Sequence, residues 1–210
     1  MDDRILALCE LSNDLLFQKI PKSRLSYYVD ASLNAGRETA KRFAGQNIRQ
    51  LYEERRIGIQ VRNGGKKGYG VVLRGQAVMA REGCSVELYK DSLDALAQHS
   101  AYGGQSLTQE AARDTHLAHE FFHILEYMEG RSLSEELEPI VRFSFLGLSF
   151  KSRINRCDEI AAHAFAKEFL GLPYLPNFYD YLYLTGTGAM TQSDFSELTG
   201  RMAVLLSENI

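Results

Sequence analysis

Residues 111–128 read AARDTHLAHEFFHILEYM, a stretch without proline or glycine in which apolar side chains recur at helical spacing. The pattern predicts an amphipathic helix from about 108 to 129. Its apolar stripe, which we expect to face the core, consists of Leu117, Phe121, Ile124, Leu125 and Met128. Residues 119–123 of this helix read HEFFH and therefore form an HExxH motif.

The two histidines of this motif, His119 and His123, are one helical turn apart and lie on the same face. Two imidazoles in this arrangement can direct a ring nitrogen at one Zn²⁺ ion. Glu120 is rotated by about 100° from His119, so it can reach a water near the metal but is poorly placed to bind the metal itself. Metal-assisted hydrolysis needs this arrangement, because the metal polarises the water and the carboxylate accepts its proton. The alternative is a pair of solvated histidines on an amphipathic helix.

A catalytic zinc site needs a third protein ligand and one open position. A second predicted helix, 157–170, offers it and carries small side chains that allow close packing: Ala161, Ala162, Ala164 and Ala166. Glu159 and His163 are four residues apart on one face, and either could reach the metal. We predict Glu159 as the third ligand and assign His163 a catalytic role, in the second sphere or as a stabiliser of the transition state. Asp158 as ligand, Glu159 as an ordinary carboxylate at a helix N-terminus, and His163 as a packing residue remain alternatives.

The rest of the chain predicts further helices around a small sheet. Apolar residues alternate with period two, between glycine-rich turns, from about 57 to 90. The order of helices, small sheet and helices indicates the α+β class, with about three strands. We expect helices at 3–18, from Asp30 as N-cap to about Arg55, at 91–99, 108–129, 157–170 and 191–208, and strands at 57–61, 70–79 and 84–89.

Two apolar segments lie between these elements. Residues 140–150 (IVRFSFLGLSF) could line a substrate cleft or form a core strand, and we favour the core strand. Residues 174–183 are rich in tyrosine and are predicted to be irregular, either packing under the C-terminal helix or placing a hydroxyl in the cleft as an oxyanion donor. We predict one domain over 1–210, with N-terminal helices and sheet in 1–100, metal-site helices in 108–170 and a C-terminal helix at 191–208.

Composition narrows the class of protein. The 210 residues are 45% hydrophobic and 24% charged, which is typical of a globular protein and argues against disorder. A net charge of −3 argues against a dedicated nucleic-acid surface, and we expect the basic pair Lys66-Lys67 to be solvated. No apolar stretch approaches 18 residues, and the acidic N-terminus is unlike a secretory signal. Three cysteines without CxxC spacing fit a reducing compartment, so we expect a cytoplasmic protein. From the net charge and the lack of a spanning segment we expect no nucleic-acid or membrane partner.

With these motifs the chain resembles the ImmA/IrrE metallopeptidases, in which the HExxH helix is followed by a helix of the form E-x-x-A-N-x-F-A-x-x-L-L-x-P. The resemblance covers roughly residues 35–175 and implies a mainly helical, minimal zincin core of the gluzincin type. It also implies that His119, His123 and Glu159 bind Zn²⁺ and that Glu120 is the base. Family members cleave DNA-binding repressors in the bacterial cytoplasm. The residues that correspond in order are Glu159, Ala162, Phe165, Ala166, Phe169, Leu170 and Pro173.

The chain departs from the family pattern at three points. His163 takes the place of an asparagine, Phe122 takes the place of the glycine before the second motif histidine, and the connection from His123 to Glu159 is long. We therefore hypothesise a zinc-dependent endopeptidase acting on a protein substrate, with a transcriptional repressor as the candidate. The alternative is a catalytically idle zinc-binding module that regulates a partner protein by binding alone. His116 is expected at the rim of the site, and the sequence does not predict an oligomeric state.

Overall fold

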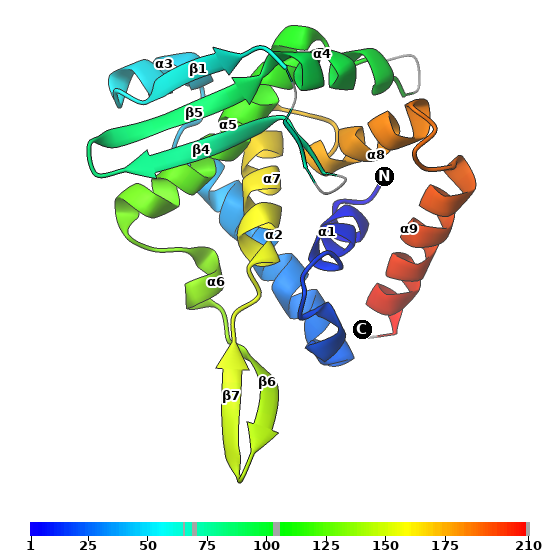
Figure 1. The fold of residues 1–210 in the computed structure, drawn as a ribbon. Helices are drawn as coiled ribbons and strands as arrows, with labels where there is room; N and C mark the ends of the chain where they lie inside the picture. The colour runs from blue at the N-terminus through cyan, green and yellow to red at the C-terminus, as the bar shows by residue number, and fades with distance from the viewer. Residues whose placement is uncertain (65, 69–70, 103–105, 209–210) are drawn as a thin grey trace.

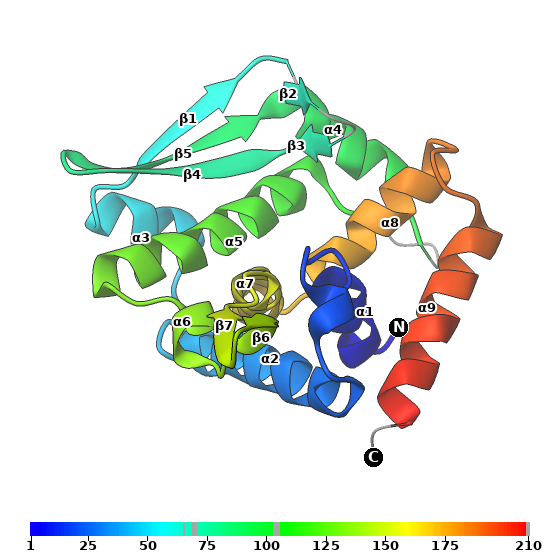
Figure 2. The same cartoon turned by 60° about the horizontal axis from the view of Figure 1, so that its bottom comes forward.

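Helix α5 (Gln109–Glu129), which carries the HExxH motif, lies between a small sheet and the other long helices (Figures 1 and 2). The computed structural model describes residues 1–64, 66–68, 71–102 and 106–208. Within these residues the chain has nine α-helices and a three-stranded sheet, which confirms the α+β class. The other helices are α1 (Asp3–Leu11), α2 (Leu25–Lys41), α3 (Ile48–Glu54), α4 (Lys90–His99), α6 (Leu133–Glu136), α7 (Arg156–Leu170), α8 (Pro176–Gly186) and α9 (Gln192–Ser207).

The three-stranded sheet has the order β1-β5-β4. Strand β1 (Gly58–Arg62) runs parallel to β5 (Gly83–Tyr89), and β4 (Gly75–Ala80) runs antiparallel to it, with Ala77 opposite Val86. Strand β4 is therefore an edge strand, and its free edge lies beside α5 (Figure 2). Two separate two-stranded ladders are formed by β2 (Lys66–Gly68) with β3 (Val71–Leu73) and by β6 (Ile140–Phe145) with β7 (Leu148–Ser152).

Helices α2 and α7 pack backbone against backbone. A Cβ atom added at Gly36 would lie 2.1 Å from the carbonyl oxygen of Ala161, so no larger residue fits there without displacing a helix. On its other side α7 packs against α5, where the rings of Phe121 and Phe165 lie 6.1 Å apart. The small residues of α7 are buried in these contacts, as the sequence predicted. Close packing thus brings the start of α7 opposite the HExxH motif.

The first two helices differ from the prediction. Helix α1 ends at Leu11 rather than at residue 18, because the chain turns through Asp14, whose carboxylate accepts the backbone N–H of Leu16. Helix α2 begins before Asp30, so the prediction of Asp30 as its N-cap is wrong. The Asp30 carboxylate instead accepts two hydrogen bonds from Arg4 of α1, at 2.8 and 3.0 Å, and joins the two helices.

The prediction of a single helix that continues to Arg55 is also wrong. The chain leaves α2 through Gly45, whose φ of 77° lies in the left-handed region that glycine adopts at low cost. Asn47 then caps a separate helix, α3, by accepting the backbone N–H of Arg49 at 2.9 Å.

The strand predicted over 70–79 is divided in two. Gly70 lies outside the described residues, Val71–Leu73 pairs with β2, and Gly75–Ala80 pairs with β5. Between the two parts the side chain of Arg74 turns into the protein, where it is 6% exposed and pairs with Asp180 at 2.8 Å. The buried guanidinium therefore marks the point where the chain passes from one ladder to the other.

Residues 174–183 are helical in large part, which corrects the prediction of an irregular segment. Helix α8 begins with Pro176 in its first turn, a position where proline fits because the N–H there needs no helical partner.

The apolar segment 140–150 is not a core strand. It forms most of the β6–β7 hairpin, which extends away from the rest of the chain (Figure 1). Only its first residue, Ile140, is buried. No helix in the described ranges is both long enough and apolar enough to cross a membrane.

Candidate metal centre

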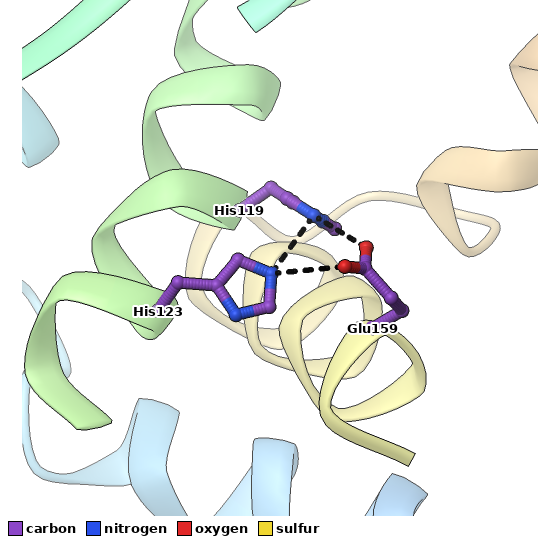
Figure 3. Close-up of side chains that lie close together, drawn as sticks. All are labelled: His119, His123 and Glu159. Carbon is purple, nitrogen blue, oxygen red and sulfur yellow. Dashed lines mark hydrogen bonds and ion pairs between the residues drawn. The ribbon is translucent and has the colours of Figure 1, made fainter. Parts of the chain in front are cut away.

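Three side chains from two helices converge on one point (Figure 3). His119 and His123 extend from α5, and Glu159 faces them from the first turn of α7. Glu159 Oε2 lies 3.2 Å from His119 Nε2, and Glu159 Oε1 lies 3.7 Å from His123 Nε2. The two Nε2 atoms are 3.3 Å apart. Among the described residues, this is the one cluster of three or more possible ligands close enough to share a metal ion.

The spacing of these atoms fits a tetrahedral zinc ion. Zinc bonds of about 2.0–2.2 Å place neighbouring ligand atoms of a tetrahedron about 3.3–3.6 Å apart. The observed separations, 3.2 to 3.7 Å, fall close to that range. Two imidazoles and one carboxylate also leave a fourth position for water or substrate, as in catalytic zinc sites. The side chains of His119 and His123 are only 13% and 18% exposed, which does not fit the alternative of solvated histidines.

Opposite charges stabilise one another within the cluster. Burial favours the neutral form of Glu159, but hydrogen bonds with His119 and His123 outweigh it and hold the pKa of this carboxyl far below its ordinary value. Burial likewise opposes protonation of His123, yet its carboxylate neighbours Glu126 and Glu159 raise its pKa to about 10. In the metal-free protein a proton on His123 thus balances the buried carboxylate. A metal ion would take over that balance as it displaces the proton.

Local interactions hold the two ligand helices in place. Thr108 caps α5 by accepting the backbone N–H of Ala111 at 3.0 Å. Asp158, the alternative third ligand, is not part of the cluster and accepts the backbone N–H and the hydroxyl of Ser134, each at 2.7 Å. It therefore ties α7 to α6, while its neighbour Glu159 remains free to face the cluster.

Glu120 lies between the histidine cluster and the edge strand β4. One carboxylate oxygen, Oε2, accepts the backbone N–H of Ala77 at 2.8 Å. The other lies near Gly75, where an added Cβ would come within 3.7 Å of it. The carboxylate is thus positioned by the sheet and opens onto the same cavity as the two histidines.

Glu126 supports His123 from one turn further along α5. Its Oε2 atom lies 3.6 Å from His123 Nδ1, and its Oε1 atom accepts the backbone N–H of Leu133 at 2.7 Å. A carboxylate beside the second ring nitrogen orients a metal-binding histidine and raises its basicity. The sequence analysis did not single out Glu126, although its position three residues after His123, on the same helix face, was an available signal.

His163 contacts the cluster without joining it. Its ring centroid lies 4.7 Å from that of His119, and its Nε2 atom lies 4.0 Å from Glu10 Oε2. Its buried Nδ1 atom has no hydrogen-bond partner in the described part of the chain. Burial, the largest cause, lowers the pKa of His163 well below its ordinary value, so the ring is neutral. The predicted catalytic role of His163 remains a prediction.

Glu10 of α1 is a component of the site that the sequence analysis missed. It is 9% exposed, lines the same cavity and accepts a hydrogen bond from Arg156 at 2.9 Å. Burial raises its pKa although Arg156 opposes the shift. The signal available in the sequence was a glutamate between Cys9 and Leu11, in a helix turn that is otherwise apolar.

These groups line one cavity of about 750 Å³. The cavity is lined by strand β4, by helices α5 and α7 and by Asp180 of α8. His116, expected at the rim, is in the wall, where Nδ1 lies 2.8 Å from the Ala112 carbonyl and burial lowers the pKa to about 4. Among the described residues, no tyrosine of 174–183 lines this cavity, whereas Tyr127 does.

Comparisons with protein families, with characterised proteins and with solved structures find no match to this chain. The functional assignment therefore depends on the residues and geometry of the site.

Proposed function

We propose that this protein is a zinc-dependent endopeptidase with a minimal zincin-like core similar to that of the ImmA/IrrE metallopeptidases. The observation that carries the proposal is the convergence of His119, His123 and Glu159, with the Glu120 carboxylate beside them in one cavity. A cytoplasmic protein substrate, with a DNA-binding repressor as the candidate, belongs to the same proposal.

The residues have separate roles in this reaction. His119, His123 and Glu159 would hold the zinc, which when bound supplies Lewis acidity and makes water a nucleophile at neutral pH. Glu120 accepts the proton of the attacking water and returns it to the leaving amine. The Ala77 N–H holds the Glu120 carboxylate at the cavity wall while the proton moves.

The position of β4 supports a peptide substrate. Gln76, Ala77 and Met79 of this edge strand line the cavity. An extended peptide can add to a free sheet edge through main-chain hydrogen bonds, with its side chains alternating between pockets. Such a peptide would pass over the metal ligands with its backbone parallel to the wall formed by β4.

Two measurements test the proposal together. Zinc per chain is measured by mass spectrometry, and cleavage is measured on a library of unstructured peptides by product sequencing. We expect one zinc per chain and cleavage that Glu120→Gln abolishes without loss of zinc. Glu110→Gln is the matched control, because Glu110 lies on the same helix and its side chain is 75% exposed.

A Glu120→Gln protein that cleaves at near the parental rate would refute the mechanism. Stoichiometric zinc without cleavage of the library or of a co-expressed repressor would support the alternative, an idle zinc-binding module. Absence of stoichiometric zinc would refute both.

A further inference from the structure

The β6–β7 hairpin exposes a continuous apolar face. Phe143 pairs with Phe150, their rings stacked at 4.5 Å, and Phe145 pairs with Leu148, so these four side chains share one face. Each is between 45% and 65% exposed. The opposite face is polar, with the hydroxyls of Ser144 and Ser149 at 3.1 Å. An isolated two-stranded hairpin is at best marginally stable in water, so this one is suited to a surface that covers its apolar face.

The turn of the hairpin is also apolar, and its leucine adopts an unfavourable backbone conformation. Leu146 and Gly147 both have positive φ, 48° and 78°, as in the type I′ turns where Asn-Gly is preferred. Leucine is disfavoured in this left-handed region, and Leu146 is 85% exposed. Asparagine would suit both the backbone and the solvent better. Strain of this kind is retained where a functional role requires the residue, which here is an apolar group at the tip.

Basic residues flank the apolar tip. Segment 140–153 contains Arg142, Lys151 and Arg153 and no acidic residue, in a chain whose net charge is −3. Arg153 pairs with Glu135, but in the described part of the chain no carboxylate pairs with Arg142 or Lys151. Two cations near the base of the hairpin are therefore available to an anionic partner.

We propose that this hairpin inserts its tip into the interface of an anionic lipid bilayer. Lys151 lies three strand residues beyond Leu148, and at about 3.3 Å per residue this is a distance of roughly 10 Å. An interfacial element buries its apolar part about 5–10 Å below the headgroups. With Phe145, Leu146 and Leu148 at that depth, Arg142 and Lys151 lie at the level of the lipid phosphates.

Other occupants fit these observations less well. Two hairpins packed face to face would cover the four apolar side chains but would offer no acidic partner to Arg142 and Lys151, since segment 140–153 contains none. A groove on a partner protein would cover the face of Phe143 and Phe150 but would not require an apolar turn. The proposal differs from the sequence expectation of no membrane partner, which rested on the absence of a spanning segment. It is independent of the proposed peptidase activity.

Co-sedimentation with lipid vesicles tests the proposal. We expect the purified protein to bind vesicles of equal parts phosphatidylglycerol and phosphatidylcholine, and to bind pure phosphatidylcholine at least about tenfold more weakly. Leu146→Asn should weaken binding about tenfold or more, because it removes an apolar side chain that becomes buried when the tip enters the bilayer. The Leu146→Asn protein should unfold at the same or a higher temperature, because asparagine adopts the positive φ of this turn with less strain. Val204→Asn is the control, since Val204 is an exposed apolar residue on the distant helix α9.

A second variant keeps the test independent of the turn. Arg142→Gln with Lys151→Gln changes two exposed side chains and should reduce binding to anionic vesicles by tenfold or more. Three outcomes would overturn the proposal: no binding to anionic vesicles, binding that Leu146→Asn leaves unchanged, or concentration-dependent self-association that Leu146→Asn abolishes. The last outcome would identify a second copy of the chain as the occupant.

Discussion

The backbone N–H of Ala77 in strand β4 donates to Oε2 of Glu120 in helix α5 at 2.8 Å. This bond joins the edge of the sheet to the motif helix and holds the Glu120 carboxylate between strand β4 and the two motif histidines. A hydrogen bond to a charged group contributes more than one between neutral groups, typically about 1.5–3 kcal/mol. The bond from Ala77 therefore contributes to the positioning of the Glu120 carboxylate.

Replacing Ala77 by proline removes this donor. Successive residues of a strand direct their N–H groups to opposite sides, so the ladder to β5 keeps its own hydrogen bonds. We expect peptide cleavage to fall about tenfold to a hundredfold with zinc content unchanged. Kinetic measurement of kcat/KM beside zinc analysis checks this. Unchanged cleavage in a folded variant would show that the Ala77 N–H does not position Glu120 for the reaction.

Glu159 and Asp158 are adjacent acidic residues with different predicted contributions. Glu159→Gln removes one of the three proposed metal ligands, and zinc affinity should fall by at least about a hundredfold, since even loss of a supporting carboxylate costs about 10- to 100-fold. Asp158→Asn should leave zinc affinity nearly unchanged and instead destabilise the α6–α7 contact made through Ser134. Competition with a chromophoric chelator measures both affinities. Equal losses in the two variants would refute the assignment of Glu159 as the ligand.

Much of the site follows from local sequence. His119 and His123 share a face because their spacing matches a helical turn, and the four α-helices predicted from 91 onward are found within about one residue of their expected ends. The position of Glu159 opposite them was expected from a resemblance and from the small residues around it. The helix ends and the shared face of the two histidines depend on interactions within or between neighbouring turns.

Features that depend on distant parts of the chain were not predictable in this way. Asp30 looked like an N-cap because its partner, Arg4, is on another helix. Arg74 interrupts a strand because Asp180 lies beside it in the fold. Glu10 enters the cavity through the packing of α1 against α7. In each case the decisive interaction joins residues far apart in sequence, and no periodic pattern records it.

Glu126 is predicted to tune the metal rather than bind it. Glu126→Gln weakens the carboxylate partner of His123 Nδ1, and we expect zinc affinity to fall about 10- to 100-fold with one zinc still bound per chain at saturation. Glu129→Gln is the matched control, because Glu129 pairs with Arg42 and Arg131 away from the histidines. An unchanged zinc affinity for Glu126→Gln would mean that the Leu133 contact, not support of His123, is its main role.

His116 makes stability dependent on pH in the acid range. Its folded pKa of about 4 lies below the unfolded value near 6.5, so the unfolded chain binds the proton more tightly. The folded protein therefore loses stability as the pH falls from about 6.5 towards 4, by about 3 kcal/mol from this residue. His116→Gln should reduce that loss, with His99→Gln as control. Urea unfolding of wild type and His116→Gln, both metal-free, at pH 7.5 and pH 5 measures the difference. In both proteins His163 contributes a dependence of the same sign as His116, and His123, whose pKa is raised, contributes one of the opposite sign. An identical pH dependence in wild type and His116→Gln would contradict the assignment.

Gly36 and Gly200 provide a matched pair for the packing of α2 on α7. A Cβ at Gly36 would lie 2.1 Å from the Ala161 carbonyl oxygen and 2.8 Å from Ala164 Cβ, so Gly36→Ala must push the two helices apart. We expect a loss of about 1–3 kcal/mol, as in other overpacked cores, together with weaker zinc binding because α7 carries Glu159. Gly200 lies inside α9 with open space around it, so Gly200→Ala should stabilise the protein by about 0.5–1 kcal/mol. Thermal unfolding of both variants distinguishes the two effects. If Gly36→Ala were as stable as Gly200→Ala, α2 and α7 would not be in the backbone contact described here.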